Sequence, residues 1–127
     1  MVGIVVISHS REIASGTVEL AGQMAGPDVR IVAAGGTADG GLGTDADRVR
    51  EAIAHADQGD GVLVLGDLGS AILTARAVLA DQEAGHLRLA DAPLVEGAVA
   101  AAVTASAGLA LEDVESAANG AGGATKL

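Results

Sequence analysis

The chain has 127 residues, half of them apolar, with a net charge of −10 and no cysteine or aromatic residue. This length fits one domain with an aliphatic core, and the lack of cysteine excludes disulfides and thiolate chemistry. The acidic balance and the absence of aromatic stacking residues argue against nucleic-acid binding. No apolar stretch reaches the roughly 20 residues of a membrane span, so a cytoplasmic protein without a signal peptide is expected.

Strands and helices are predicted to alternate along the chain. Apolar β-branched runs predict strands, and apolar residues at helical spacing predict helices. In chain order the expected elements are strand Val2–Ile7, helix Glu12–Met24, strand Val29–Ala33, a glycine-rich loop Ala34–Gly43, a helix from Thr44 or Asp45 to about Asp57, strand Val62–Leu65, helix Ile72–Leu79, strand Leu87–Leu89, a helix from Pro93 to about Ser106 and helix Leu111–Ala118.

This alternation is typical of an α/β fold, doubly wound, with a mostly parallel sheet of about four strands and helices on both faces. Residues 1–118 are expected to form the single domain. Residues 119–127 are rich in Gly and Ala and are expected to form a flexible tail.

Two polar residues stand directly after predicted strands. His9 follows the first strand, and Asp67 follows the third. Ligands of open α/β sheets bind beyond the carboxyl ends of the strands, so the two side chains face one crevice if these strands are neighbours. Imidazole is a nucleophile and a good leaving group near neutral pH, which makes His9 the candidate carrier of a phosphoryl group. Asp67 could fix its tautomer; the alternative is that both residues only cap helices.

Small residues near this pair are candidates for binding phosphate. Gly69 and Ser70 open a helix whose amides could hold an anion, Ser10 adds a hydroxyl beside His9, and Gly36 could allow a close backbone approach. Ordinary capping and loop geometry remain the alternatives. The three histidines lack metal-ligand spacing, so no metal or cofactor is predicted. An apolar rim is expected from Leu42, Leu68 and Ile72.

Four segments, taken together and in order, resemble the mannose-type enzyme IIA family of the phosphotransferase system. They are Ile4–Ser10, Ala33–Gly36, Gly43–Asp45 and Val64–Ala71. Within that family, Asp91–Ala98 is similar to the phosphotransferase subunits of phosphoenolpyruvate-dependent dihydroxyacetone kinases. The resemblance extends over nearly the whole chain, from Met1 to about Ala118.

The resemblance implies a homodimeric phosphohistidine carrier of the doubly wound fold. His9 would be the phosphorylated residue, Asp67 the carboxylate beside it, and Gly69–Ser70 the phosphate-binding loop. The donor would be the phosphocarrier protein HPr. The acceptor would be ADP bound to DhaL, the nucleotide-binding subunit of the kinase.

Three other functions stay open. One is an enzyme IIA that serves a mannose-type sugar transporter. The second is a receiver-like domain phosphorylated on Asp67, although the acidic pair that binds Mg²⁺ in such domains is missing after the first strand, and Lys126 is the only lysine. The third is a non-catalytic binding module on the same scaffold. Acid-labile phosphate would indicate His9, and base-labile phosphate would indicate Asp67.

Overall fold

The computed structural model describes residues 1–83 and 85–127, and within these ranges it contains four strands, five α-helices and one 3-10 helix. They are β1 Gly3–Ser8, α1 Arg11–Ala25, β2 Ile31–Gly35, α2 Ala46–Ala56, β3 Val62–Gly66, α3 Gly69–Leu79, β4 Leu87–Leu89, α4 Leu94–Ser106, α5 Leu111–Gly120 and η1 Ala121–Gly123. The sheet order is β2-β1-β3-β4, and every pair is parallel. The predicted α/β fold and the adjacency of the first and third strands are confirmed.

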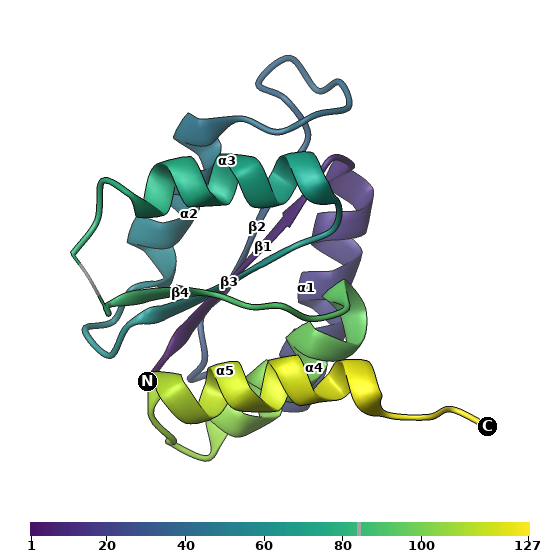
Figure 1. Ribbon diagram of the computed structural model, residues 1–127, viewed down its shortest axis with the longest axis vertical. Helices are drawn as coiled ribbons and strands as arrows, with labels where there is room; N and C mark the ends of the chain where they lie inside the picture. Colours follow the sequence, from purple (N-terminus) through teal and green to yellow (C-terminus); the bar gives the residue numbers. More distant parts are fainter. Residues whose placement is uncertain (84) are drawn as a thin grey trace.

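Helices cover both faces of the sheet, because successive residues of a strand point to opposite sides. Ile4 and Val6 of β1 pack with α1, α4 and α5, whereas Val5 and Ile7 pack with α2 and α3. Figure 1 shows the sheet between these two layers. Strands buried on both faces explain the continuous apolar runs of the sequence. Within the described residues, no helix has the length and hydropathy needed to cross a bilayer.

Two predicted boundaries were displaced near the carboxyl edge of the sheet. β2 ends at Gly35, two residues later than predicted, because Ala34 and Gly35 pair with Ile7 and Ser8 of β1; it also begins two residues later, at Ile31. α3 begins at Gly69 rather than at Ile72, since the Ile72 amide donates to the Leu68 carbonyl and closes a first turn there. Gly and Ser have low helix propensity, so the predicted helical run started only at Ile72, although Gly69 and Ser70 were expected to open this helix.

The end of the chain contacts the domain at two points. Helix α5 extends two residues past the predicted Ala118, and the Asn119 side chain accepts a hydrogen bond of 2.9 Å from the Asp91 amide. Lys126 forms an ion pair of 2.7 Å with Glu96 near the start of α4. Both contacts join residues of the predicted tail, 119–127, to the preceding part of the chain. The division of the chain at residue 118 stays a prediction.

Two glycine-to-alanine substitutions test how tightly α2 packs on the sheet: one at Gly3, where α2 lies close, and a control at the exposed Gly16 of α1. A methyl group at Gly3 of β1 would lie 2.1 Å from the carbonyl oxygen of Ala56, so Gly3→Ala should lower the free energy of unfolding by about 1–3 kcal/mol or more. Gly16 is exposed in the middle of α1, with no described atom beyond its own helix within 4 Å of such a methyl group. Gly16→Ala should raise stability by about 0.5–1 kcal/mol. Urea denaturation measures the stability of both variants. Equal changes in the free energy of unfolding would contradict the close packing of α2 against Gly3.

Candidate functional site

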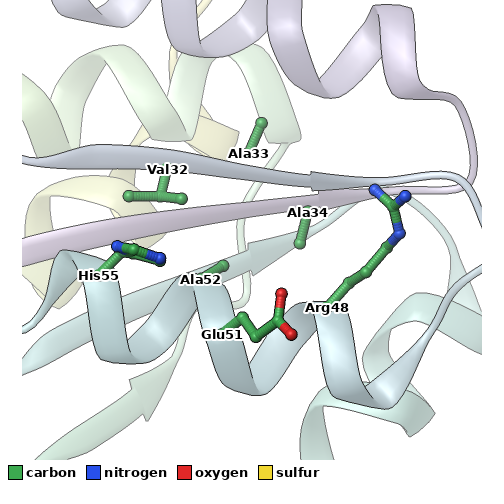
Figure 2. A pocket seen from close by; sticks show the side chains of 7 residues that line it. All are labelled: Val32, Ala33, Ala34, Arg48, Glu51, Ala52 and His55. Carbon is green, nitrogen blue, oxygen red and sulfur yellow. The ribbon is translucent and has the colours of Figure 1, made fainter. Parts of the chain in front are cut away.

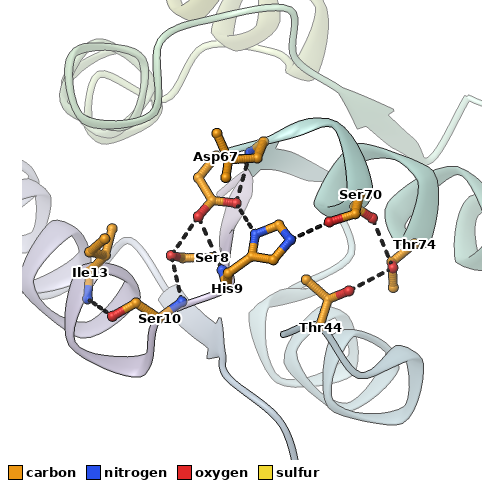
Figure 3. A network of polar contacts seen from close by, with 9 residues as sticks. Ser8, His9, Ser10, Ile13, Thr44, Asp67, Ser70 and Thr74 are labelled. Carbon is orange, nitrogen blue, oxygen red and sulfur yellow. Dashed lines mark hydrogen bonds and ion pairs between the residues drawn. The ribbon is translucent and has the colours of Figure 1, made fainter. Parts of the chain in front are cut away.

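His9 and Asp67 lie side by side at the carboxyl ends of neighbouring strands. β1 ends at Ser8 and β3 ends at Gly66, so each of the two residues is the first after its strand. The Asp67 amide donates to the Ile7 carbonyl at 3.2 Å and so extends the β1–β3 ladder by one bond. The sheet register therefore fixes the relative height of the two side chains (Figure 3).

The Asp67 carboxylate accepts hydrogen bonds from four donors. Oδ1 accepts from His9 Nδ1 at 2.9 Å and from the Leu68 amide at 2.8 Å. Oδ2 accepts from Ser8 Oγ at 2.8 Å and from the His9 amide at 3.1 Å. The buried Ser8 hydroxyl was not predicted as a partner; its only signal in the sequence is a polar residue at the end of a buried strand.

These contacts determine the charge state of Asp67. Burial acts to raise the pKa of Asp67, but the hydrogen bonds from Ser8, from the His9 ring and from backbone amides outweigh it and hold the pKa below its ordinary value of 3.8. The carboxylate is therefore ionised at neutral pH, and an ionised carboxylate only accepts hydrogen bonds.

The partners of the two ring nitrogens assign the tautomer of neutral His9. Because Asp67 only accepts, Nδ1 carries the proton that it donates. Nε2 then has the free lone pair, and its partner is the Ser70 hydroxyl, which donates to it. Nε2 is thus the nucleophilic nitrogen, and it points toward the start of α3 (Figure 3).

The N-terminus of α3 offers hydrogen-bond donors next to His9. Leu68 occupies the cap position and makes no side-chain cap bond. Within the described part of the chain, the amides of Gly69, Ser70 and Ala71 have no hydrogen-bond partner. Unpaired amides and the helix dipole make such a terminus suitable for an anion. The Ala71 amide was not among the predicted donors, which were those of Gly69 and Ser70.

The donors of Ser10 and Gly36 are engaged elsewhere. Ser10 Oγ donates to Glu12 Oε2 at 3.3 Å and caps α1 by accepting from the Ile13 amide at 3.3 Å, and the Ser10 amide donates to Ser8 Oγ. The Gly36 amide donates to the Ser8 carbonyl at 3.1 Å, and its φ of 72° turns the chain out of β2. Both residues shape the backbone around His9, and their amides are already used.

Two of the three residues predicted for an apolar rim, Leu42 and Leu68, are exposed. Leu42 is 82% exposed, and the amide of the next residue, Gly43, donates to the His9 carbonyl. Leu68 is 62% exposed and directly follows Asp67. The third predicted member was wrong: Ile72 is half-buried against Gly66, and the exposed large apolar side chain of α3 is that of Leu73.

The other two histidines lie away from this site. His55 is exposed on α2, as predicted. His86, predicted to be a surface residue, has a side chain that is 35% exposed, and its Nε2 lies 2.8 Å from Asp57 Oδ2. Among the described residues, no group of three or more metal-ligating side chains comes together.

A cavity of about 130 Å³ lies between α2 and the edge strand β2 (Figure 2). It is lined by Val32, Ala33, Ala34, Arg48, Glu51, Ala52 and His55. None of the predicted site residues lines it. Its polar members all belong to α2, and charged side chains beside an open sheet edge are a common protection against pairing with another chain. Because its lining contains none of the predicted site residues, the cavity is separate from the His9 site.

Comparison with known proteins defines the class of this domain. The family model EIIA-man, described as PTS system fructose IIA component, matches residues 3–115. The chain belongs to this family. A solved structure described as the protein of unknown function EF1359 has the same fold, with a TM-score of 0.87, 36% identity, and coverage of 99% of this chain and 98% of that one.

Within the family, the similar curated proteins are DhaM subunits. The "PEP-dependent dihydroxyacetone kinase, phosphoryl donor subunit DhaM" of Escherichia coli is 44% identical over 90% of this chain. The chain spans only 25% of that protein's length. The "PEP-dependent dihydroxyacetone kinase 2, phosphoryl donor subunit DhaM" of Listeria innocua is 42% identical over 81% of this chain and 85% of its own length. These relatives support a role in phosphotransferase-system phosphotransfer.

The lowered pKa of Asp67 predicts a pH dependence of stability. Because the pKa of Asp67 is lower in the folded chain than in the unfolded chain, the unfolded chain binds more protons in acid. The resulting stabilisation is fully present above the unfolded value and is lost as the pH falls through the folded value. Asp67→Asn should therefore show a shallower loss of stability than the wild type between about pH 5 and pH 2.

Denaturant titrations at several pH values measure this difference. Asp39, Asp57 and Glu96 also have lowered pKa values, but they titrate in both proteins and cancel when the two curves are subtracted. Parallel curves for the two proteins would contradict the assigned role of the Asp67 contacts.

Proposed function

We propose that the chain is a phosphohistidine carrier, the phosphotransferase subunit of a phosphoenolpyruvate-dependent dihydroxyacetone kinase. His9 would accept a phosphoryl group from HPr and pass it to ADP bound to DhaL. The proposal includes a homodimer that acts in the cytoplasm. The observation that carries it is the orientation of His9, whose Nδ1 is held by Asp67 while Nε2 points at the N-terminus of α3. The names of the relatives support the choice of kinase.

In the loading step, Nε2 of His9 attacks the phosphorus of the phosphohistidine of HPr. The new N–P bond forms on Nε2 while the N–P bond of the donor breaks, and the donor imidazole recovers its electron pair. His9 then carries the phosphoryl group on Nε2 and a proton on Nδ1, so its ring becomes cationic. The ionised Asp67 stabilises that cation through Nδ1–H.

Ser70 has to change partners during loading. Its hydroxyl donates to Nε2 in the unloaded protein, where the incoming phosphorus has to be. Once Nε2 is phosphorylated, the same hydroxyl can donate to a phosphoryl oxygen, together with the amides of Gly69, Ser70 and Ala71. The onward transfer reverses this order, with an ADP oxygen as the attacking atom and the His9 ring as the leaving group.

The donors at this site are mostly neutral, which suits a carrier. Arg11 is two residues from His9, but its guanidinium packs against Gly40 in the loop before α2. A phosphoryl group held by amides and one hydroxyl is stabilised moderately. Tighter binding of the loaded state would slow its departure, since uniform binding does not accelerate transfer.

A second candidate function is an enzyme IIA of a sugar transporter. It is favoured by the family description, which names a IIA component for fructose. The two functions share the loading step on His9 and differ in the acceptor. The receiver-like alternative is disfavoured because both oxygens of Asp67 are occupied by four donors and neither is free to attack phosphorus.

Phosphoryl uptake tests the proposal directly. We expect the wild type, mixed with phosphoenolpyruvate, enzyme I and HPr, to gain one acid-labile phosphoryl group by intact mass. His9→Ala should gain none, because it lacks the imidazole that attacks the phosphorus. His55→Ala, which removes an exposed histidine on α2, serves as the matched control and should be loaded like the wild type.

Loss of the mass shift on adding DhaL and ADP, with formation of ATP, would identify the kinase acceptor. Loss only with a IIB transporter component would identify the second candidate. No uptake with active HPr, or a base-labile phosphoryl group that persists in His9→Ala, would overturn the carrier function.

Ser70→Ala should slow loading by about tenfold, because one hydroxyl donor to the transferring group is lost at a half-exposed site. Single-turnover loading from phosphorylated HPr measures the rate. Ser106→Ala removes a hydroxyl of α4 that bonds the Val103 carbonyl, and it should leave the rate unchanged. Equal rates for Ser70→Ala and the wild type would exclude a role for this hydroxyl.

A further inference from the structure

Two threonine hydroxyls connect the loop before α2 with α3, close to His9. Thr44 Oγ1 and Thr74 Oγ1 lie 2.8 Å apart, although the residues are 30 positions apart in sequence. Thr74 Oγ1 also donates to the Ser70 carbonyl at 3.0 Å. Both threonines are partly buried, and Figure 3 shows them on the Ser70 side of the histidine ring.

The direction of these bonds is determined by the number of protons. A hydroxyl has one proton to donate, and that of Thr74 goes to the Ser70 carbonyl. Thr44 must therefore be the donor in the Thr44–Thr74 pair. Neither hydroxyl has a proton left for a phosphoryl oxygen, so neither can act as a phosphate donor while this arrangement holds.

The two threonines complete a closed series of hydrogen bonds and covalent links, a circuit that begins at the His9 carbonyl and ends at the His9 ring. The His9 carbonyl accepts from the Gly43 amide at 3.0 Å, and Gly43 is bonded covalently to Thr44. Thr44 donates to Thr74, and Thr74 donates to the Ser70 carbonyl. The circuit returns through the contact between Ser70 Oγ and His9 Nε2. The backbone and the ring of His9 are thus tied to two segments that are tied to each other.

We propose that Thr44 and Thr74 are positioning residues for phosphoryl transfer at His9. They fasten the loop before α2 to the first turns of α3 and thereby set the distance between Nε2 and the donors of Ser70. The inference rests on the proposed carrier function and adds two residues that act only through His9 and Ser70. Transfer rates are sensitive to placement, because small displacements of reacting groups cost large factors in rate.

The test uses the full chain with isosteric variants. Thr44→Val and Thr74→Val remove one hydroxyl each and keep the branched shape, whereas Thr44→Ser and Thr74→Ser keep the hydroxyl. We expect each Val variant to lower kcat for loading from phosphorylated HPr by about three- to tenfold, with KM unchanged, the size expected for one neutral hydrogen bond. The Ser variants should stay within about twofold of the wild type.

Thr104→Val is the matched control. Thr104 Oγ1 donates to the Ala100 carbonyl at 2.8 Å, the same i to i−4 bond that Thr74 makes, but on α4, which packs on the opposite face of the sheet. Its rate should equal that of the wild type. Thermal unfolding of all variants separates a change in rate from a change in stability.

Coupling provides a second measurement. If the two hydroxyls act as one connection, the double variant Thr44→Val/Thr74→Val should be no slower than Thr74→Val alone, because removing either hydroxyl already breaks it. Nitrogen-15 shifts of the His9 ring should move in both Val variants, since the Ser70 contact with Nε2 changes.

The outcomes distinguish this inference from the proposed function. A wild type that takes up no phosphoryl group overturns the carrier function, and the inference with it. A wild type that is loaded normally, with Val variants equal to it in kcat and ring shifts, overturns the positioning role alone. If Thr74→Val unfolds, Thr44→Val decides, because it leaves the bond between Thr74 and the α3 backbone intact.

Discussion

The Asp67 carboxylate joins the parts of the site to one another. It accepts the amide and ring protons of His9, the hydroxyl of Ser8 and the amide of Leu68. One anionic group therefore connects the end of β1, the end of β3 and the residue that precedes α3. Because these donors also lower its pKa, the carboxylate remains charged and leaves Nε2 as the unprotonated nitrogen. An amide at this position could still accept the Nδ1 proton, but it would carry no charge.

The core consists of small aliphatic residues, and their close packing positions the ends of β1 and β3 next to each other. The largest fully buried side chains are Ile, Leu and Val, and alanines fill the inner faces of the helices. Helices can then approach the strands closely; a methyl group at Gly97 of α4 would lie 3.0 Å from Leu65 of β3. A close-packed interior is rigid. The residues that follow β1 and β3 therefore keep fixed positions relative to each other.

In the proposed carrier, the phosphoryl group would lie at the N-terminus of α3, beside the glycine-rich loop. The amides at the start of α3 supply directed donors without a full positive charge, and the loop is fastened to the same helix by Thr44 and Thr74. A carrier has to bind its phosphoryl group well enough to orient it and weakly enough to release it. Neutral donors beside a paired histidine and carboxylate meet both requirements.

The sequence by itself determined the alternation of strands and helices, because buried strands are continuous apolar runs, and it placed His9 and Asp67 directly after two of these strands. The tertiary structure alone decided which nitrogen of His9 is free, that the amides of Ser10 and Gly36 are already used, and that Thr44 meets Thr74. These features depend on hydrogen bonds between segments distant in sequence, and neither periodicity nor local propensity carries information about such partners.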